Sequence, residues 1–282
     1  MSRVLIAGCG DIGSALGTRL LAEGHDVWGL RRSAAALPAG MTALRMDVTN
    51  PAALDNLPVG FDTVFYIVTP DTYEDAAYAS AFVCGTENLL RALCSEGARP
   101  GRLIFVSSTS VYGQSQGEWV DEASPTDPRS FAGKRLLQGE EAVLGGPIPG
   151  TVVRFGGIYG RGEGRLVKRV RDGSPCQEAP PLYTNRIHRD DCVSVLHHLL
   201  NLDDPQRIYL GVDSEPAAQC AVMDWISAEL GLPPSPRTAA VDDHGKGGKR
   251  CRNARLLATG YRFLYPSYRD GYGAVLEGAG AT

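Results

Sequence analysis

The chain lacks the features that mark a nucleic-acid-binding, membrane or secreted protein. Its 282 residues carry a formal net charge of −4, so no basic excess favours nucleic acid or an anionic membrane surface. No run approaches the roughly 18 apolar residues that a membrane span needs. No apolar segment with a small-residue cleavage site follows the N-terminus. We therefore expect a cytoplasmic protein that binds neither nucleic acid nor membrane.

The cysteine pattern lacks the spacing of a metal site or of a thioredoxin-like site. Seven cysteines are present, but no CxxC pair occurs and their number is odd. We therefore expect reduced cytosolic thiols, most of them small buried apolar side chains, and no bound metal.

The order of the predicted elements indicates an α/β fold. Apolar runs too short for helices predict strands, and stretches with helical spacing of apolar residues separate them. The predicted strands are 3–8, 26–30, 42–48, 61–69, 102–109 and one within 149–160, and the predicted helices are 14–24, 78–97 and 135–146. Strands that alternate with helices predict a Rossmann-type doubly wound parallel sheet.

The pattern loosens in the C-terminal part of the chain. Pro-rich patches there separate predicted helices at 189–201 and 221–231 and a short predicted strand at 207–212. We expect a dinucleotide-binding domain at 1–160 and a smaller substrate-binding lobe at 161–282, some segments of which return to the sheet.

A GxGxxG motif, "GCGDIG", joins the first predicted strand to the first predicted helix. Gly8 permits a tight turn, Gly10 lets the backbone approach a pyrophosphate, and Gly13 lets the helix pack closely on the strand. The first helical residues, Asp11 and Ile12, then present backbone N–H groups to the phosphates. The alternative is an ordinary glycine turn without a ligand.

The end of the second predicted strand indicates which dinucleotide binds. An acidic residue there would bond the ribose hydroxyls and favour NAD, but this strand runs into Arg31, Arg32 and Ser33. Guanidinium groups clamp a 2′-phosphate bidentately. We therefore expect NADP(H), with NAD as the second possibility; the alternative is that these arginines are surface charges.

Two further strand ends contribute candidate cofactor contacts. Asp47 ends the third predicted strand, where it would accept from the adenine amino group or, alternatively, cap the following helix. Val68 and Thr69 end the fourth predicted strand, where the chain would pass beneath the dinucleotide ribose.

Five motifs in order, "VLIAGCGDIG", "FVSSTSVYG", "VVRFGGIYG", "NRIHRDDCV" and "YPSYRDGY", resemble the extended short-chain dehydrogenase/reductase superfamily. The likeness is to its NAD-dependent epimerase/dehydratase members and, through the GxGxxG spacing, to their atypical branch. It implies a Rossmann domain that binds NAD(P), a C-terminal substrate lobe, and hydride transfer on a nucleotide sugar or another hydroxy or keto compound. Proteins of this class often form homodimers, which one sequence neither shows nor excludes.

The resemblance also implies roles for the segment after the fifth predicted strand. It places Ser108 at the family's Ser/Thr position, which hydrogen-bonds the substrate oxygen. Thr109 and Ser110 would face the substrate beside it.

The family's Tyr-xxx-Lys pair is missing. The matching helix region reads "RSFAGKRLLQGEE", and no tyrosine in the chain is followed by lysine at the fourth residue. One alignment puts Ala132 and Leu136 at the pair, and a second puts Ser130 and Lys134 there. The second alignment keeps the lysine, which would hold the nicotinamide ribose, but a serine is too weak an acid to replace a phenol.

Other residues are candidates for the missing proton donor. They are the tyrosines Tyr66, Tyr73 and Tyr159, and His188. The histidine is a candidate because it titrates near neutrality. The alternative for His188 is a structural role at the lobe interface.

Substrate contacts are expected where the second lobe begins. Tyr159, Arg161 and Asn185 are the candidates, and an arginine there would bind a substrate diphosphate or carboxylate. The alternative is that Arg161 pairs with Glu163 on the surface.

Two functions are consistent with these residues. The first is an NADP(H)-dependent oxidoreductase or epimerase with a small-molecule substrate, favoured by the preserved Ser108. The second is a non-catalytic NADP(H)-binding sensor or regulatory protein, favoured by the missing tyrosine.

Overall fold

The structure is a computed structural model that describes residues 1–33, 36–94, 99–239 and 247–280. The chain forms two compact units that are discontinuous in sequence. The first comprises 1–111, 126–154 and 193–209, and the second comprises 112–125, 155–192 and 210–282. The sequence predicts a domain at 1–160 and a lobe at 161–282, some segments of which return to the sheet. In the structure, 112–125 belongs to the second unit and 193–209 to the first.

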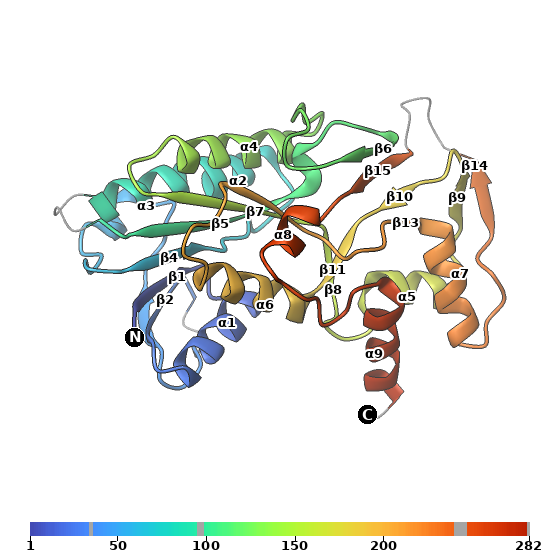
Figure 1. Ribbon diagram of the computed structural model, residues 1–282, viewed down its shortest axis with the longest axis horizontal. Coiled ribbons are helices and arrows are strands. Elements are labelled where there is room, and N and C mark those ends of the chain that lie inside the picture. The colour runs from blue at the N-terminus through green and yellow to red at the C-terminus, as the bar shows by residue number, and fades with distance from the viewer. Residues whose placement is uncertain (34–35, 95–98, 240–246, 281–282) are drawn as a thin grey trace. The chain divides into compact units, whose positions relative to one another are not determined.

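A seven-stranded sheet forms the centre of the first unit (Figure 1). Its strands in spatial order are β3 (Thr42–Arg45), β2 (Asp26–Arg31), β1 (Arg3–Ala7), β4 (Thr63–Tyr66), β5 (Arg102–Ser108), β7 (Gly150–Phe155) and β12 (Ile208–Gly211). The pairs from β3 to β5 are parallel. This order is that of a Rossmann sheet, so the predicted fold class is confirmed. The short strand predicted at 207–212 is the seventh strand of this sheet.

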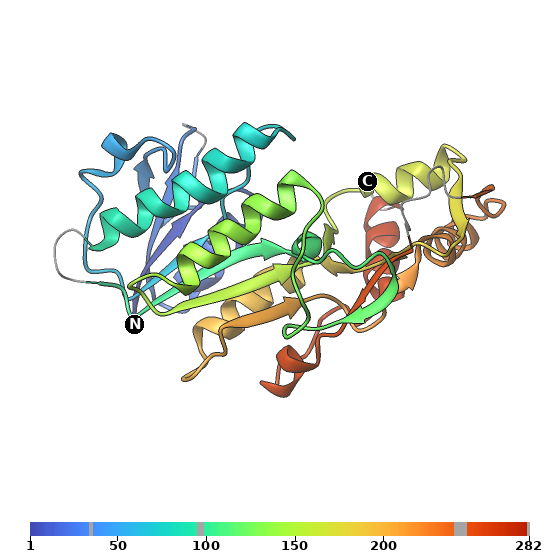
Figure 2. The ribbon, with the colours of Figure 1, turned by 90° about the horizontal axis from the view of Figure 1, so that it is seen from above.

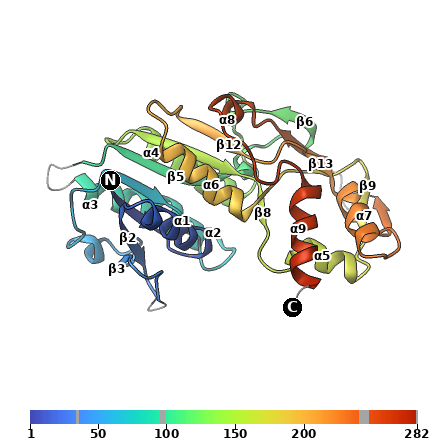
Figure 3. The ribbon, with the colours of Figure 1, turned by 60° about the horizontal axis from the view of Figure 1, so that its bottom comes forward.

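Helices cover both faces of the sheet. Those on one face are α2 (Asp75–Tyr78), α3 (Gly85–Cys94) and α4 (Phe131–Leu144), of which α3 and α4 lie in front of the sheet in Figure 2. On the opposite face lie α1 (Asp11–Ala22) and α6 (Arg189–Leu200), which come forward in Figure 3. A π-helical stretch, η2 (Ala79–Cys84), connects α2 to α3. The helix end predicted at Gly97 lies outside the described residues.

The continuous apolar pattern of β1 follows from this layering. Val4, Leu5, Ile6 and Ala7 are all fully buried, because helices exclude water from both faces of the sheet. An apolar run of this length is therefore typical of a central parallel strand rather than of an alternating edge strand.

In its described residues, the second unit contains small sheets and four helices. Its strands are β6 (Gln116–Val120), β8 (Gly157–Tyr159), β9 (Cys176–Ala179), β10 (Tyr183–Thr184), β11 (Arg186–His188), β13 (Ala217–Ala218), β14 (Arg237–Ala239) and β15 (Gly248–Cys251). They form a sheet in the order β13-β10-β15-β6 and the pairs β11–β8 and β14–β9. The helices are α5 (Gly164–Arg171), α7 (Gln219–Glu229), α8 (Ala254–Ala258) and α9 (Tyr268–Gly280).

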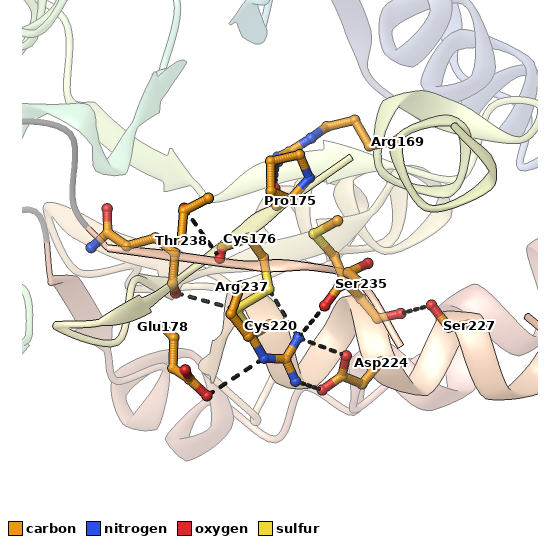
Figure 4. Close-up of a disulfide and its surroundings, with 12 residues drawn as sticks. Arg169, Pro175, Cys176, Glu178, Cys220, Asp224, Ser227, Ser235, Arg237 and Thr238 are labelled. Atoms are coloured by element: carbon orange, nitrogen blue, oxygen red, sulfur yellow. Dashed lines mark hydrogen bonds and ion pairs between the residues drawn. A yellow bond between two sulfur atoms is a disulfide. The ribbon is translucent and has the colours of Figure 1, made fainter. Parts of the chain in front are cut away.

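A disulfide between Cys176 and Cys220 joins β9 to the first turn of α7 (Figure 4). The two residues belong to an apolar cluster that includes Val167, Met223 and Ile226. The expectation of reduced thiols is therefore wrong for this pair. The partners are 44 residues apart in sequence, and the cysteine spacing does not show that β9 and α7 meet.

Among the described residues, no helix combines the length and the apolar character needed to cross a membrane. In the same part of the chain, no group of three or more His, Cys, Asp or Glu side chains is arranged to hold a metal ion.

Candidate functional site

A cavity of about 670 Å³ lies in the first unit, at the carboxyl ends of β1, β2 and β4. Of the residues predicted to bind the coenzyme, those that line it are Gly8, Gly10, Arg31, Arg32, Ser33, Asp47, Val68 and Thr69. The strand order reverses beside β1, and folds of this kind bind ligands at the carboxyl edge of the sheet at that point.

The glycines of the motif differ in what surrounds them. Gly8 has φ +100°, and a Cβ there would lie 2.4 Å from the carbonyl oxygen of Ile67. A Cβ on Gly13 would lie 2.4 Å from the carbonyl oxygen of Gly8. A Cβ on Gly10 would meet nothing within 4 Å. Gly8 and Gly13 are thus required by the protein's own packing, whereas Gly10 faces open space.

That open space lies before the N-terminus of α1. Gly10 is the N-cap residue and provides no side-chain cap. Asp11 and Ile12 form the first turn, whose N–H groups and dipole favour an anion. A cradle that any side chain at Gly10 would fill, at the end of a 12-residue helix, suits a pyrophosphate.

The two arginines after β2 have different environments. The Nε of Arg31 is buried and has no hydrogen-bond partner among the described residues. Both Nη atoms of Arg32 donate to the carboxylate of Asp71, and the Nη1–Oδ2 distance is 2.7 Å. This hydrogen bond holds the pKa of the Asp71 carboxyl below its usual range. Ser33 is exposed at the same edge.

Asp47 lies at the cavity wall but does not cap a helix. Its Oδ1 accepts from the backbone N–H of Thr49, at 2.9 Å, and from the Thr49 hydroxyl, at 2.8 Å. The following 3-10 helix, η1 (Pro51–Leu54), is capped by Asn50, so the capping alternative for Asp47 is wrong. A local turn therefore fixes the Asp47 carboxylate at the cavity.

Ser108 is the last residue of β5, and Thr109 and Ser110 begin the short 3-10 helix η3 (Thr109–Val111). The Oγ of Ser108 accepts from the backbone N–H of Ser110 at 3.2 Å. A hydroxyl that accepts through a lone pair still has its hydrogen to donate. Ser108 can therefore be held in place by the chain and also donate to a bound oxygen.

A buried network fixes the end of β5. The Ser107 hydroxyl donates to Glu140 Oε1 at 2.5 Å, and Arg154 Nη2 donates to Glu140 Oε2 at 2.6 Å. Glu140 and Arg154 are at most 3% exposed. Because these residues come from β5, α4 and β7, the network sets the position of the strand end that carries Ser108.

Helix α4 contacts the Ser108–Ser110 segment but presents no phenol to it. A Cβ on Gly133 would lie 2.5 Å from the carbonyl oxygen of Ser110, so the helix packs directly on that backbone. Ser130 is the N-cap, and its side chain accepts from the Gly133 N–H. Lys134 is exposed one turn along.

The alignment that puts Ala132 and Leu136 at the pair places two apolar side chains there, both of them buried in the core. Neither alignment therefore supplies an acid/base group in place of the family's tyrosine.

The tyrosines of the first unit differ in their fitness as proton donors. The Tyr66 hydroxyl is buried and donates to the carbonyl oxygen of Ala81, and burial raises the Tyr66 pKa. Tyr73 is 69% exposed. Its ring lies 4.9 Å from that of Phe131, the first residue of α4. Tyr66 is therefore structural, whereas Tyr73 holds an accessible hydroxyl near the start of α4.

His188 lines a second cavity, of about 610 Å³, within the second unit. Its ring is buried, and its Nδ1 accepts from the backbone N–H of Asp190 at 3.2 Å. Burial lowers the His188 pKa, an effect opposed by the charges of Asp190 and Asp191. The ring packs against Gly160, where a Cβ would lie 2.2 Å from Nε2, and its centroid lies 4.0 Å from that of Tyr265.

Tyr159 is poorly placed for acid/base chemistry. Its hydroxyl is buried, and a Cβ on Gly271 would lie 1.8 Å from it. Burial, reinforced by the charge of Asp213, raises the Tyr159 pKa. The phenol thus faces helix α9 and is held neutral.

Asn185 uses its amide within the second unit. Its Nδ2 donates to the carbonyl oxygen of Lys249 at 2.8 Å, and its Oδ1 accepts from the N–H of Cys251 at 2.7 Å. The structure thus gives Asn185 a structural role beside strand β15.

The side chain of Arg161 is exposed. Glu163, which was expected to pair with it in the alternative interpretation, forms an ion pair with Arg171 at 2.9 Å.

Sequence reasoning missed Asp71, Glu140 and Arg154. The signal for Asp71 was its position in the segment that follows β4, because side chains that follow the parallel strands of one sheet share its carboxyl edge. No local pattern identified the Glu140–Arg154 pair.

Comparison with known proteins agrees with this geometry. A family model described as "NAD dependent epimerase/dehydratase family" matches residues 4–210. A Methylobacillus flagellatus structure that carries the same family name is 38% identical, covers 98% of both chains and has a TM-score of 0.79. Protein YeeZ of Escherichia coli K12 is 28% identical over 94% of this chain and 97% of its own length.

A third relative has a named reaction. The dTDP-6-deoxy-L-talose 4-dehydrogenase (NAD(P)(+)) of Kitasatospora kifunensis is 34% identical over 56% of this chain. The match spans 53% of that enzyme, about half of its length.

Proposed function

Because the chain belongs to the NAD-dependent epimerase/dehydratase family, we propose that it is an NADP(H)-dependent oxidoreductase or epimerase. Its substrate is a sugar-nucleotide-like compound or another keto or hydroxy compound. The observation that carries the proposal is the cavity at the carboxyl edge of the sheet, where Gly10 leaves open space before α1. The name of the Kitasatospora relative, a dTDP-sugar dehydrogenase, supports the substrate class.

The residues around the cavity fit a dinucleotide. The first turn of α1 would bind the pyrophosphate through backbone N–H groups. Arg31, Arg32 and Ser33 would supply the donors for a 2′-phosphate, which favours NADP(H) over NAD(H). Val68 and Thr69 would lie along the ribose.

A bound nicotinamide would supply or accept the hydride at the substrate carbon. Ser108 would donate its hydroxyl hydrogen to the substrate oxygen while the N–H of Ser110 holds its Oγ. Thr109 and Ser110 would line the substrate's approach.

We propose Tyr73 as the proton donor that replaces the family's tyrosine. Its ring packs on Phe131, and residues three apart on a helix share a face. Lys134 therefore lies on the side of α4 that Tyr73 contacts. The family's phenol and lysine would then come from two elements instead of one helix.

A panel of carbonyl substrates with NADPH tests the proposal. Ser108→Ala removes one donor to the developing oxyanion and should lower turnover roughly a hundredfold or more. Tyr73→Phe should lower turnover by about 10² and leave NADPH binding unchanged. Tyr78→Phe is the matched control, since Tyr78 also contacts Phe131, at 5.5 Å between ring centroids.

Each outcome has a distinct meaning. Turnover that is insensitive to Ser108→Ala contradicts the mechanism, and equal effects of Tyr73→Phe and Tyr78→Phe contradict the role of Tyr73. Tight NADPH binding without turnover on any substrate would favour the second function, a non-catalytic NADP(H)-binding sensor, for which the absence of a phenol on α4 is the supporting observation.

A further inference from the structure

The arginine expected to bind the 2′-phosphate already binds an anion of this chain. Arg32 and Asp71 form a two-point ion pair across the carboxyl edge of the sheet, between the turn after β2 and the segment after β4. Both residues line the coenzyme cavity. The carboxylate therefore occupies the edge of the guanidinium group that the two Nη atoms form.

A carboxylate and a phosphate use the same donors of a guanidinium group, in the same fork geometry. The Nη donors that Arg32 gives to Asp71 are therefore withheld from a ligand. A 2′-phosphate that uses these Nη donors must displace Asp71 from Arg32, and one that uses the Nε edge instead still has the carboxylate beside it as a like charge. The ribose of NAD carries neutral hydroxyls there, which can donate to a carboxylate instead of being repelled by it.

On this geometry we infer that Asp71 sets the coenzyme preference by competing with the 2′-phosphate for Arg32. The inference rests on the proposed dinucleotide function. The buried Nε of Arg31, which has no hydrogen-bond partner among the described residues, leaves one donor group nearby that Asp71 does not occupy. The site thus accepts both coenzymes, and Asp71 reduces the advantage that the two arginines give to NADP(H).

The size of the effect follows from the exposure of the pair. The side chains of Arg32 and Asp71 are 50% and 65% exposed, and exposed ion pairs contribute little in water. Competition with Asp71 together with its repulsion of a phosphate should weaken NADPH binding about tenfold. Binding of NADH should be unchanged or slightly stronger with Asp71 present.

The chain offers a matched control four residues away. Asp75 forms a two-point pair with Arg135, at 2.8 Å and 2.9 Å, and its side chain is 51% exposed. Asp75 does not line the cavity. Asp75→Asn therefore removes the same charge and the same kind of pair from the same segment without freeing Arg32.

The test is calorimetric titration of the full chain with NADPH and, separately, NADH for wild type, Asp71→Asn and Asp75→Asn. We expect Asp71→Asn to tighten NADPH binding about tenfold without tightening NADH binding, and Asp75→Asn to change neither by more than about twofold. Thermal melting of each variant checks that the fold is retained. Asp71→Ser also removes the carboxylate and tests the same effect if Asp71→Asn does not fold.

Three results would overturn the inference alone: equal tightening of both coenzymes by Asp71→Asn, no change, or weaker NADPH binding. The same effect in Asp75→Asn would also overturn it, because loosening of the segment would then be the cause. If folded wild type binds neither coenzyme, the proposed function fails, and this inference fails with it.

Discussion

Two substitutions in the glycine motif separate its folding role from its ligand role. Gly8 has φ +100°, and an added Cβ would lie 2.4 Å from the Ile67 carbonyl oxygen and 2.7 Å from the backbone nitrogen of Val68. Gly10 has φ −79°, and an added Cβ would contact no protein atom within 4 Å. Alanine should therefore damage the fold at Gly8 and leave it intact at Gly10.

The magnitudes follow from these contacts. An alanine with a left-handed backbone conformation costs about 1–2 kcal/mol. At Gly8 the added Cβ also overlaps backbone atoms of Ile67 and Val68, just after β4, and backbone atoms cannot rotate away as a side chain can. We expect a total loss of at least about 3 kcal/mol, which corresponds to a fall in Tm of roughly 6 °C or more for a chain of this size. Gly10→Ala should change the free energy of unfolding by less than about 1 kcal/mol.

Coenzyme binding should show a different pattern. In Gly10→Ala, the methyl group takes the space before the first turn of α1, so a pyrophosphate cannot approach the N–H groups. Each charge-assisted hydrogen bond that is lost costs about 1.5–3 kcal/mol, and the loss of two would weaken binding about a hundredfold or more.

The assay is NADPH titration by fluorescence, with thermal melts of each variant in the absence of ligand. Gly273→Ala is the control, because Gly273 also lacks positive φ and has no atom within 4 Å of an added Cβ. Wild-type NADPH affinity in Gly10→Ala would refute the assignment of the motif as a phosphate cradle.

Two predictions concern the second unit. The Cys176–Cys220 disulfide closes a loop with a sequence separation of 44. Its removal should lower the free energy of unfolding, measured in urea, by about 4 kcal/mol, whereas Cys84→Ser should leave it unchanged. A urea midpoint that does not change when reductant is added would contradict this prediction. Burial raises the pKa of Asp213 to about 7, above its unfolded value of about 3.9, so stability should fall by about 2–3 kcal/mol between pH 5 and pH 8. Asp213→Asn should remove this loss of stability between pH 5 and pH 8. If the variant and the wild type show the same pH dependence of the free energy of unfolding, the prediction is wrong.

The parts of the fold that depend on local pattern could be predicted from the sequence. The run Val4–Ala7 is apolar without alternation because both faces of β1 are covered, and the glycines mark the turn that follows. The strand at 207–212 was also visible, but its place in the main sheet depends on a chain path that no local pattern encodes.

Interactions between distant segments could not be predicted. The sequence predicts Asn185 as a substrate contact, whereas in the structure its amide bonds the backbone of Lys249 and Cys251, more than 60 residues away. The strands that make this possible are short: β10 and β13 have two residues each. Alternation of side chains cannot identify a strand of two residues.

The segment between β4 and α2 contacts both the end of β2 and helix α4. Three alternate residues between β4 and the start of α2 reach two places: Asp71 pairs with Arg32 after β2, whereas Tyr73 packs on Phe131 of α4. Asp75, the first residue of α2, pairs with Arg135 of the same helix α4. The segment therefore joins the coenzyme edge of the sheet to the start of α4. In the proposed function, Tyr73 of this segment supplies the phenol that α4 lacks, because a reaction requires a group near the reacting atoms and not at one place in the sequence.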